Sequence, residues 1–548
     1  MDKSIRVART VAVVSCLLLP TLAAARDPVV RVADDSQQVS FSLTLPLRNK
    51  PELDQLVAQL YNPKSPQFRH FLTATEFNAR FAPTEADYAT LKARALSAGL
   101  KVTGEHTGRT LLNVSGDVAT VRSLFSTQMR WRQASNGRPY LAADSEPIQP
   151  TLLADLGGNA AALTQKSATS SAHPVALPAG SRTTAAPQTA ADFNGPFTPS
   201  EILGAYDLSS IQNGGEVVGL IEFSGPNNTT VYNDAGVYAS EYGLNHPNIT
   251  IDAIDGGNSE TDGGNNSNPL EVALDVDMVM LASNPTQIVI FNAPNFYPQI
   301  LDTYTYIADL GTVQHISTSW TVAEPDIDRA TVGSEYDQFE KMAAEGIAVF
   351  AASGDSGAIP CVAQSGIGYC VNDPASQPYV TGVGGTVLTL DASLQYEQEV
   401  AWSDGGGGVS EYSYAPSYQS VDIYYCDPSG PCWRQVPDVA LNAGNPYYVY
   451  CSICGGDIAA IGTSAAAPLW AGFWSLVSKG LGTPAGFANP TLYTAQAGDY
   501  FRGPYQFAII DITSGGNGVF SAGPGYDLVT GIGTFDGAVL YNAILQNW

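Results

Sequence analysis

Runs of apolar residues recur between about positions 215 and 355 and are separated by stretches with helical periodicity. The runs are EVVGLIEF (216–223), TQIVIFNA (286–293), VQHISTSW (313–320) and GIAVFAASGD (346–355). Apolar strands that alternate with helices predict a parallel sheet covered by helices on both faces. Because ligands bind at the carboxyl ends of the strands in such sheets, we expect the functional residues there.

An earlier unit, residues 26–165, has a different pattern. Helical periodicity at 83–100 and 117–126 alternates with strand patterns at 109–116 and 129–133, which predicts a small α+β sandwich. Residues 166–190 are rich in Ser, Thr, Ala and Pro and have no periodicity. We interpret this stretch as a linker that contains the site of proteolytic cleavage, followed by a second domain at 191–548.

Residues 1–25 have the features of a secretory signal. Three basic residues precede the apolar run VAVVSCLLLP, and Ala23–Ala25 are small residues suited to cleavage. No later segment has the pattern of a transmembrane helix, so we expect a secreted protein, extracellular or periplasmic. Six cysteines follow the signal, and an even number in an exported chain predicts disulfides. Sequence cannot choose among the 15 connectivities; our hypothesis is nearest-neighbour pairing (361–370, 426–432, 451–454), with zinc at Cys451 and Cys454 as the weaker alternative.

Charge differs sharply between the two units. Residues 1–190 hold 20 Lys and Arg and 14 Asp and Glu, a net charge of +6, whereas residues 191–548 hold 5 and 38, a net charge of −33. So acidic a body does not bind nucleic acid or an anionic membrane by charge. A cationic segment can dock on it near neutrality and be released by acid, although ordinary solubility is the simpler explanation of the negative charge.

Ser464 has the setting of a nucleophile. It lies in IGTSAAAP (461–468), a tight turn that opens an Ala-rich segment. A serine hydroxyl needs a base to take its proton, and this chain has only five histidines. His70, His106 and His173 precede the second domain, His246 lies in a loop pattern, and the apolar surroundings of His315 favour a core position.

Carboxylates offer an alternative base. Asn268 can cap a helix and Pro269 suits its first turn, which places Glu271 and Asp275 at i and i+4 on one face. Burial and proximity would raise at least one carboxyl pKa and give a base that works in acid. Acidic pairs are also common on the surface of so acidic a domain, and Asp277 points elsewhere and has a structural role.

Asp355 is the third candidate carboxylate. It follows a buried strand in AASGDSG, where a protonated carboxyl group can donate a hydrogen bond to a developing oxyanion. An Asx turn is the simpler interpretation from sequence alone.

The chain resembles the sedolisins, or serine-carboxyl peptidases, including kumamolisin-like members. The matching pieces follow the order of the family through most of residues 200–535: LEVALD, STSW, AASGDSG, DPASQPYVTGVGGT, RQVPDVA, GTSAAAP and DITSGGNG with AGPGYDLVTGIG. The stretch YNPKSPQFRHFLTATEFNARFAPT resembles the activation propeptide of the family. The resemblance implies a subtilisin-like α/β fold, with a parallel sheet flanked by helices, preceded by a small α+β ferredoxin-like prodomain.

The resemblance also implies roles for single residues. Ser464 would be the nucleophile and Glu271 its general base, while Asp275 would orient Glu271 and share its proton. Asp355 would help to bind the oxyanion, and Glu222 and Trp320 would support the site through hydrogen bonds. A conventional Ser-His-Asp enzyme is disfavoured because the chain lacks a histidine motif such as HGTH and has Asp355 where an amide would be expected.

A calcium loop is implied near the C-terminus. Asp511 and Asp527 would supply carboxylates and Ile512, Gly523 and Gly525 would supply carbonyl oxygens, a hard oxygen set suited to one structural calcium ion. Without the resemblance, a Gly-rich turn with stray acids would be the better interpretation. The stretch Gly405–Gly408 matches a Gly-rich segment of the family loosely, and a flexible surface loop and a loop that contacts the substrate are equal alternatives.

The sequence thus predicts a secreted, acid-acting endopeptidase made as a monomeric zymogen. Its partners would be protein or peptide substrates and its own propeptide, acting as intramolecular inhibitor and chaperone, with no nucleic acid and no membrane. A tripeptidyl-peptidase of the same family and a catalytically silent secreted binding protein on this scaffold remain the alternatives.

Overall fold

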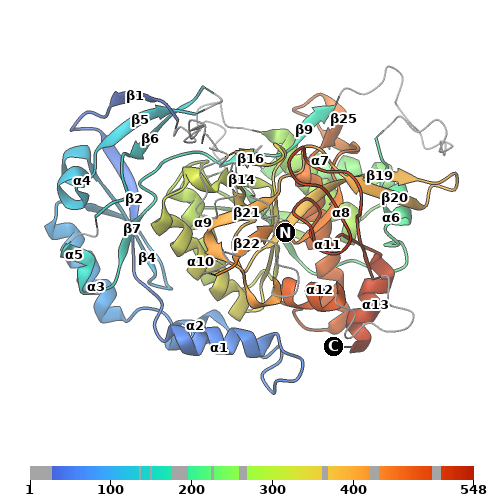
Figure 1. Cartoon of the computed structure of the whole chain (residues 1–548), viewed down its shortest axis with the longest axis horizontal. Coiled ribbons are helices and arrows are strands. Elements are labelled where there is room, and N and C mark those ends of the chain that lie inside the picture. The colour runs from blue at the N-terminus through green and yellow to red at the C-terminus, as the bar shows by residue number, and fades with distance from the viewer. Residues whose placement is uncertain are drawn as a thin grey trace, which may run out of the picture.

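The structure is a computed structural model (Figure 1) that describes residues 27–134, 137–148, 151–175, 196–223, 228–257, 268–360, 368–419, 431–496 and 508–547. The predicted signal at 1–25 therefore lies outside the described residues, as do Cys361 and Cys426. No helix within the described ranges is long and apolar enough to cross a membrane.

An eight-stranded sheet forms the centre of the second domain. Its strands, in spatial order, are β11 (Asn248–Ala253), β12 (Gln287–Asn292), β10 (Val218–Glu222), β13 (His315–Thr318), β15 (Ala348–Ala352), β19 (Thr381–Leu390) and β20 (Tyr396–Ala401), and β23 (Val439–Asn442) also pairs with β19. All pairings are parallel except β19 with β20. The predicted strand at 313–320 is in fact two strands, β13 and β14 (Trp320–Ala323), separated at Ser319.

Helices cover both faces of this sheet. One face carries α7 (Asn228–Tyr242), α8 (Pro269–Ser283), α11 (Thr463–Leu481) and α13 (Gly537–Asn547), and the other carries α9 (Gln299–Leu310) and α10 (Arg329–Ala344). Successive strand residues face opposite sides, so Phe350 of β15 packs toward α11 while Val349 packs toward α9 and α10. This confirms the parallel sheet covered on both faces.

The N-terminal domain is a separate α+β unit with its own core. It contains the antiparallel sheet β3-β4-β2-β7 and the sheet β1-β5-β6, and the predicted helices at 83–100 and 117–126 are confirmed as α3 and α4. Its strands are β1 (Val29–Val32), β2 (Gln38–Thr44), β3 (Lys101–Glu105), β4 (Leu111–Asp117), β5 (Met129–Gln133), β6 (Pro139–Ala143) and β7 (Asn159–Ala161). Its helices are α1 (Lys50–Leu60), α2 (Ala74–Arg80), α3 (Glu85–Ser97), α4 (Val118–Phe125) and α5 (Thr151–Ala154).

The N-terminal domain docks on α9 and α10 through polar contacts, on the left in Figure 1. His106 Nε2 lies 3.2 Å from Asp302 Oδ1, and the amide of Gly108 donates to Asp309 Oδ2 at 2.8 Å. Lys50 Nζ pairs with the buried Glu340 Oε1 at 2.8 Å. The basic residues of the first domain thus contact acidic residues of the second, as the charge distribution suggested.

Part of the predicted linker is ordered against the second domain. Within residues 166–175, β8 (Thr169–Ser170) pairs with β14, and β9 (His173–Val175) pairs with β25 (Gly456–Ile461), which forms a hairpin with β24 (Tyr447–Cys451). Strand pairing joins backbone groups, so a stretch without side-chain periodicity can still form it. Residues 176–195 lie outside the described part of the chain.

Shorter elements complete the fold. They are α6 (Pro199–Ala205), α12 (Asn489–Gln496), β16 (Ile359–Pro360), β17 (Tyr369–Cys370), β18 (Asn372–Asp373), β21 (Gly408–Tyr414), β22 (Trp433–Val436), β26 (Ile509–Ile510), β27 (Thr534–Phe535) and the 3₁₀ turns η2 (Glu324–Asp326) and η3 (Ser417–Gln419).

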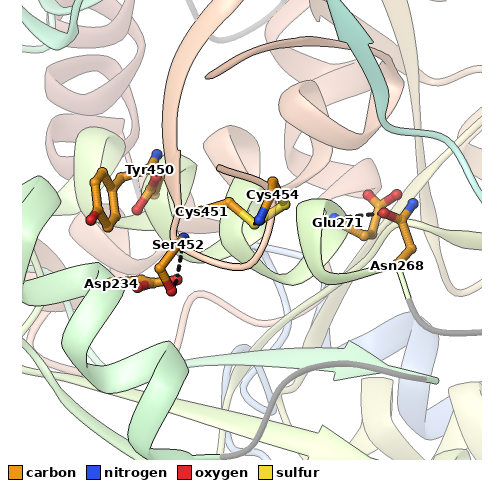
Figure 2. Close-up of a disulfide and its surroundings, with 8 residues drawn as sticks. Asp234, Asn268, Glu271, Tyr450, Cys451, Ser452 and Cys454 are labelled. Atoms are coloured by element: carbon orange, nitrogen blue, oxygen red, sulfur yellow. Dashed lines mark hydrogen bonds between the residues drawn. A yellow bond between two sulfur atoms is a disulfide. The ribbon is translucent and has the colours of Figure 1, made fainter. Parts of the chain in front are cut away.

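Cys451 and Cys454 form a disulfide, which confirms that pairing and excludes zinc there (Figure 2). Cys370 and Cys432 are also disulfide-bonded.

Candidate active site

Ser464 lies at the start of α11, after the turn that the sequence predicted. Gly462 precedes the helix with φ 141°, a conformation that side-chain-bearing residues rarely adopt. A Cβ atom at Gly462 would also collide with the carbonyl oxygen of Ser171, so only glycine lets the two backbones approach. The Ser464 side chain is fully buried in this form.

Helix α8 places two carboxylates on the face that packs against α11. Asn268 Oδ1 caps the helix by accepting from the amide of Glu271 at 3.4 Å, and Pro269 occupies the first turn. Glu271 and Asp275 are both completely buried, one helical turn apart. The predicted helix, its cap and its paired carboxylates are therefore present.

A chain of hydrogen bonds continues from this pair. Ser319 Oγ donates to Asp275 Oδ1 at 2.8 Å and lies 3.4 Å from the carbonyl oxygen of Ser464. Trp320 Nε1 donates to Glu222 Oε2 at 2.8 Å. The carboxyl groups of Glu222 and Asp275 face each other closely enough to hydrogen-bond when one is protonated. Glu222 is thus the direct carboxyl partner of Asp275, whereas Glu271 acts on Asp275 through its charge.

Burial dominates the electrostatics of this cluster. It raises the pKa of Glu271 to about 7, against the nearby hydroxyl of Ser464 and the amide of Ala172, which lower it. Burial, together with the charges of Glu222 and Glu271, raises the pKa of Asp275 far above its ordinary value. Three carboxyl groups without a cationic partner among the described residues must share protons, which suits chemistry in acid.

Asp355 follows β15 and contacts Thr463, the residue before Ser464. Its Oδ1 accepts from the amide of Thr463 at 2.9 Å and from the Thr463 hydroxyl at 2.6 Å. Its Oδ2 has no hydrogen bond within the described residues and lies 3.6 Å from His173 Nε2. Burial raises the pKa of Asp355 to about 7, so the group is protonated in acid. The six residues singled out from the sequence therefore converge on one place: Glu222, Glu271, Asp275, Trp320, Asp355 and Ser464.

The linker crosses this site. The amide of Ala172 donates to Glu271 Oε2 at 2.8 Å, and Ser171 and Ala172 are both buried. Before this point, Ser170 and Thr169 pair with Trp320 and Thr321 of β14. After it, residues 173–175 pair with residues 459–461 of β25. The chain is held as an extended peptide on both sides of Ser464.

Further contacts hold the chain upstream. Asn295 Oδ1 accepts from the amide of Ala168 at 2.8 Å, and Asn295 Nδ2 donates to the Ala168 carbonyl oxygen at 3.0 Å. Lys166 Nζ pairs with Asp326 Oδ2 of η2 at 2.6 Å. A cavity of about 360 Å³ beside Lys166 and Thr169 is lined by Thr321, Val322 and Ala323 of β14.

Sequence reasoning missed several of these groups. Ser319 stood inside the quoted STSW motif and could have been found there, because it directly follows a buried strand. Asn295 and the backbone of Ala172 carried no local signal. His315 is the predicted core residue, with Nε2 2.7 Å from Ser478 Oγ. Gly405–Gly408 is buried, so the surface-loop alternative is wrong; Gly406 packs on Ser353 and Gly354.

The predicted calcium ligands lie around one loop. The amide of Gly525 donates to Asp511 Oδ2 at 2.8 Å, and that of Gly523 donates to Asp527 Oδ2 at 3.0 Å. Burial raises the pKa of both Asp511 and Asp527. An exposed carboxylate at Asp511 and a buried one at Asp527 face one Gly-rich loop; with carbonyl oxygens at Ile512 and in the loop, they fit a hard cation such as calcium.

Comparisons with known proteins agree with this fold. Residues 29–156 match the family described as pro-kumamolisin, activation domain. The chain is 30% identical over 540 residues to kumamolisin of Bacillus sp. (strain MN-32), covering 93% of this chain and 92% of that one. It is 25% identical to tripeptidyl-peptidase sed4 of Aspergillus fumigatus, covering 94% of each chain. A solved structure of Pseudomonas sedolisin, a serine-carboxyl proteinase complexed with pseudo-iodotyrostatin, matches with 26% identity and TM-score 0.56, over 64% of this chain and 98% of that one.

The fold and the preceding activation domain define a subtilisin-like peptidase made as a zymogen. The chain belongs to the sedolisin family of serine-carboxyl peptidases and is a serine-type hydrolase of peptide bonds.

Proposed function

We propose that this protein is a secreted, acid-acting endopeptidase whose first substrate is its own linker, at the Ser171–Ala172 bond. The observation that carries the proposal is the hydrogen bond from the Ala172 amide to Glu271 Oε2 in an extended chain that crosses Ser464. The amide nitrogen beside the acid-base group is the nitrogen that leaves when a peptide bond is cleaved. This contact supports the bond before Ala172 as the one that is cleaved.

The chemistry needs only residues of this chain. Ser464 Oγ bonds to the Ser171 carbonyl carbon while Glu271 takes the hydroxyl proton. The C–N bond then breaks, and Glu271 returns that proton to the Ala172 nitrogen. Water next attacks the acyl group, again losing its proton to Glu271, and Ser464 regains its hydroxyl. Glu271 ends each cycle unchanged.

Neighbouring groups stabilise these steps. Both Asp355 and the carbonyl of Ser171 adjoin Gly462, so protonated Asp355 can donate to the oxyanion that forms there. Glu222 and Asp275 hold a proton between them and keep negative charge near Glu271 low. Departure of the linker uncovers Glu271, and the loss of burial lowers its pKa toward the acidic range in which the enzyme works.

Contacts beyond the third acyl-side residue favour endopeptidase action over tripeptidyl-peptidase action. Counting back from the scissile bond, Thr169 is the third residue, Ala168 the fourth and Lys166 the sixth. Asn295 bonds both backbone groups of Ala168, and Asp326 pairs with Lys166. A cleft that binds the fourth and sixth residues accepts an internal stretch of chain.

Calcium forms part of the same proposal. Asp511 and Asp527 would hold the ion together with carbonyl oxygens of Ile512, Gly523 and Gly525. The bound ion would supply charge neutralisation that ties the loop to β26, with no part in the cleavage step.

The test is self-processing of the purified full chain after acidification to about pH 4, where ordinary carboxyl groups titrate. Mass spectrometry should show a cut between Ser171 and Ala172 in the wild type and none in Ser464→Ala or Glu271→Gln. Glu397→Gln, an exposed acid on β20, is the matched control and should process normally. Normal processing by Glu271→Gln would remove Glu271 as the base, and a first cut elsewhere would remove the assigned bond.

A further inference from the structure

We propose that the hairpin β24–β25 is a binding edge for the substrate residues that follow the scissile bond, and that Asp277 and Asp234 are positioning residues that hold this edge. The inference rests on the proposed function. It adds a recognition site on the leaving-group side, where the second, third and fourth residues after the cut would bind through their backbone.

The pairing of the linker defines this edge. His173 lies opposite Ile461, Pro174 opposite Ala460 and Val175 opposite Ala459, in antiparallel register. Addition of a peptide strand to a sheet edge binds by main-chain hydrogen bonds, so it accepts many sequences. Strand β25 runs directly into Gly462, Thr463 and Ser464, so a peptide on this edge has a fixed register relative to the nucleophile.

Pro174 indicates which backbone groups are used. Residues opposed across an antiparallel pair alternately exchange hydrogen bonds and face away from each other. Proline has no amide hydrogen, so Pro174 fits a position where no bond is exchanged with Ala460. Alternation then assigns the bonds to His173 and Val175, which are the second and fourth residues after the scissile bond.

The hairpin is fixed to the helices beneath it. Asp277 Oδ2 accepts from the amide of Tyr450 at 2.9 Å. Asp234 Oδ2 of α7 accepts from the amide of Ser452 at 2.9 Å and from its hydroxyl at 3.0 Å. The Cys451–Cys454 disulfide closes the turn between these anchors and β25; Figure 2 shows Asp234 and Tyr450 on one side of it and Glu271 with Asn268 on the other.

Helix α8 therefore serves two purposes. Glu271 and Asp275 face the nucleophile, and Asp277, two residues further on, holds the hairpin that would bind the leaving segment. Asp277 is buried, so its loss would leave the Tyr450 amide without an acceptor. The same rigid helix thus sets both the acid-base group and the position of the departing chain.

The first experiment uses the processed wild-type enzyme and a set of peptides with one common acyl side. Proline is placed in turn at the second, third and fourth residue after the cut. Proline at the second or fourth position should lower kcat/KM roughly tenfold through the lost hydrogen bond, while proline at the third should leave it unchanged. Equal tolerance at all three positions, or a loss confined to the third, would overturn the binding edge.

The second experiment tests the anchors with two substrates that share an acyl side. One continues for four residues after the cut, and the other ends in an anilide leaving group. Asp277→Ala and Asp234→Ala should raise KM for the extended peptide roughly tenfold and leave anilide hydrolysis within twofold of wild type. Asp277→Asn keeps an acceptor oxygen and should restore most of the affinity.

The outcomes separate this inference from the proposed function. Equal losses on both substrates would show general damage to the active site and refute a positioning role. Wild-type enzyme that cleaves neither substrate would refute the proposed endopeptidase, and cleavage without a positional proline pattern would refute the binding edge alone.

Discussion

Asp355 is fixed by Thr463, whose amide and hydroxyl both donate to Asp355 Oδ1, at 2.9 and 2.6 Å. These bonds leave Oδ2 directed at the point where the Ser171 carbonyl passes Gly462. The residue before the nucleophile therefore orients the group that we propose to bind the oxyanion.

Replacing Asp355 should separate rate from binding. Asp355→Ala removes a donor to the developing charge and should lower kcat about 10²- to 10³-fold with little change in KM. Asp355→Asn keeps an N–H donor that does not titrate, so it should retain more activity and lose less as pH rises through about 7. Steady-state kinetics on a peptide substrate from acid pH to above pH 7 measures both. Equal kcat in Asp355→Ala and wild type would contradict the oxyanion role.

Docking of the prodomain should weaken in acid through Asp302. Burial alone would raise the pKa of Asp302, but hydrogen bonds with His106, Asp255 and Asn113 bring it below the ordinary value. A carboxyl group whose pKa is lower in the docked than in the undocked form stabilises docking above its undocked pKa. This stabilisation is lost as pH falls through the lowered value. Asp302→Asn lacks this charge and should release the prodomain more readily. It should therefore process itself roughly three- to tenfold faster at pH 5 to 6.

The measurement is the rate of appearance of the processed chain as a function of pH. Glu397→Gln, exposed and on β20, is the control for general loss of charge. An unchanged profile in Asp302→Asn would show that this contact does not control release.

A buried acidic pair under α10 should favour stability in acid. The Tyr297 hydroxyl donates to Glu335 Oε1 at 2.9 Å, and Gln377 Nε2 donates to Asp373 Oδ2 at 2.7 Å. Burial raises the pKa of Asp373 to about 6 and that of Glu335 well above its ordinary value. Raised carboxyl pKa values give stability that is full below the unfolded pKa and lost as pH rises through the raised one.

Glu335→Gln removes one of these titrating groups. In both proteins the free energy of unfolding should fall between pH 4 and 7. The fall should be about 1–2 kcal/mol smaller in the variant, since one pKa unit corresponds to about 1.4 kcal/mol. Thermal unfolding in the uncleavable Ser464→Ala background measures the difference. Parallel curves for the two proteins would contradict the assignment.

Chelation should lower thermal stability if the C-terminal loop binds calcium. Ion binding to the folded state alone contributes about 2–4 kcal/mol at saturating calcium, so EDTA should lower Tm by roughly 5 °C. Asp511→Asn, which changes an exposed carboxylate that accepts from the Gly525 amide, should match the chelated wild type and show no further response to EDTA. A wild-type Tm that is independent of EDTA would count against the site.

Local patterns in the sequence predicted much of the site. The cap at Asn268 and the i, i+4 spacing of Glu271 and Asp275 depend on neighbours along one helix, and so does the turn at Ser464. The apolar runs predicted the parallel sheet, because burial on both faces leaves a compositional mark.

Other features depend on long-range backbone contacts and left no such mark. Ala172 meets Glu271 through its amide, which every residue except proline has, and Asn295 recognises the backbone of Ala168. The break between β13 and β14 at Ser319 is set by pairing with β8 and β18 rather than by residue type. Gly405–Gly408 is buried because Gly406 packs closely on Ser353, a contact that its composition could not reveal.

The position of β9 has a consequence for how activation ends. A cut after Ser171 releases the prodomain from the chain, but residues 172–175 remain attached to the second domain and pair with β25. Phe197 of the same domain is bridged to Tyr447 on β24, the other strand of this hairpin. The new amino terminus would then be a tethered product, with its ammonium group beside the Glu271 carboxylate. The part of the cleft that binds residues before the cut would be empty, and the part that binds residues after it would still be occupied. Full turnover on other proteins would therefore require residues 172–175 to be removed or to dissociate.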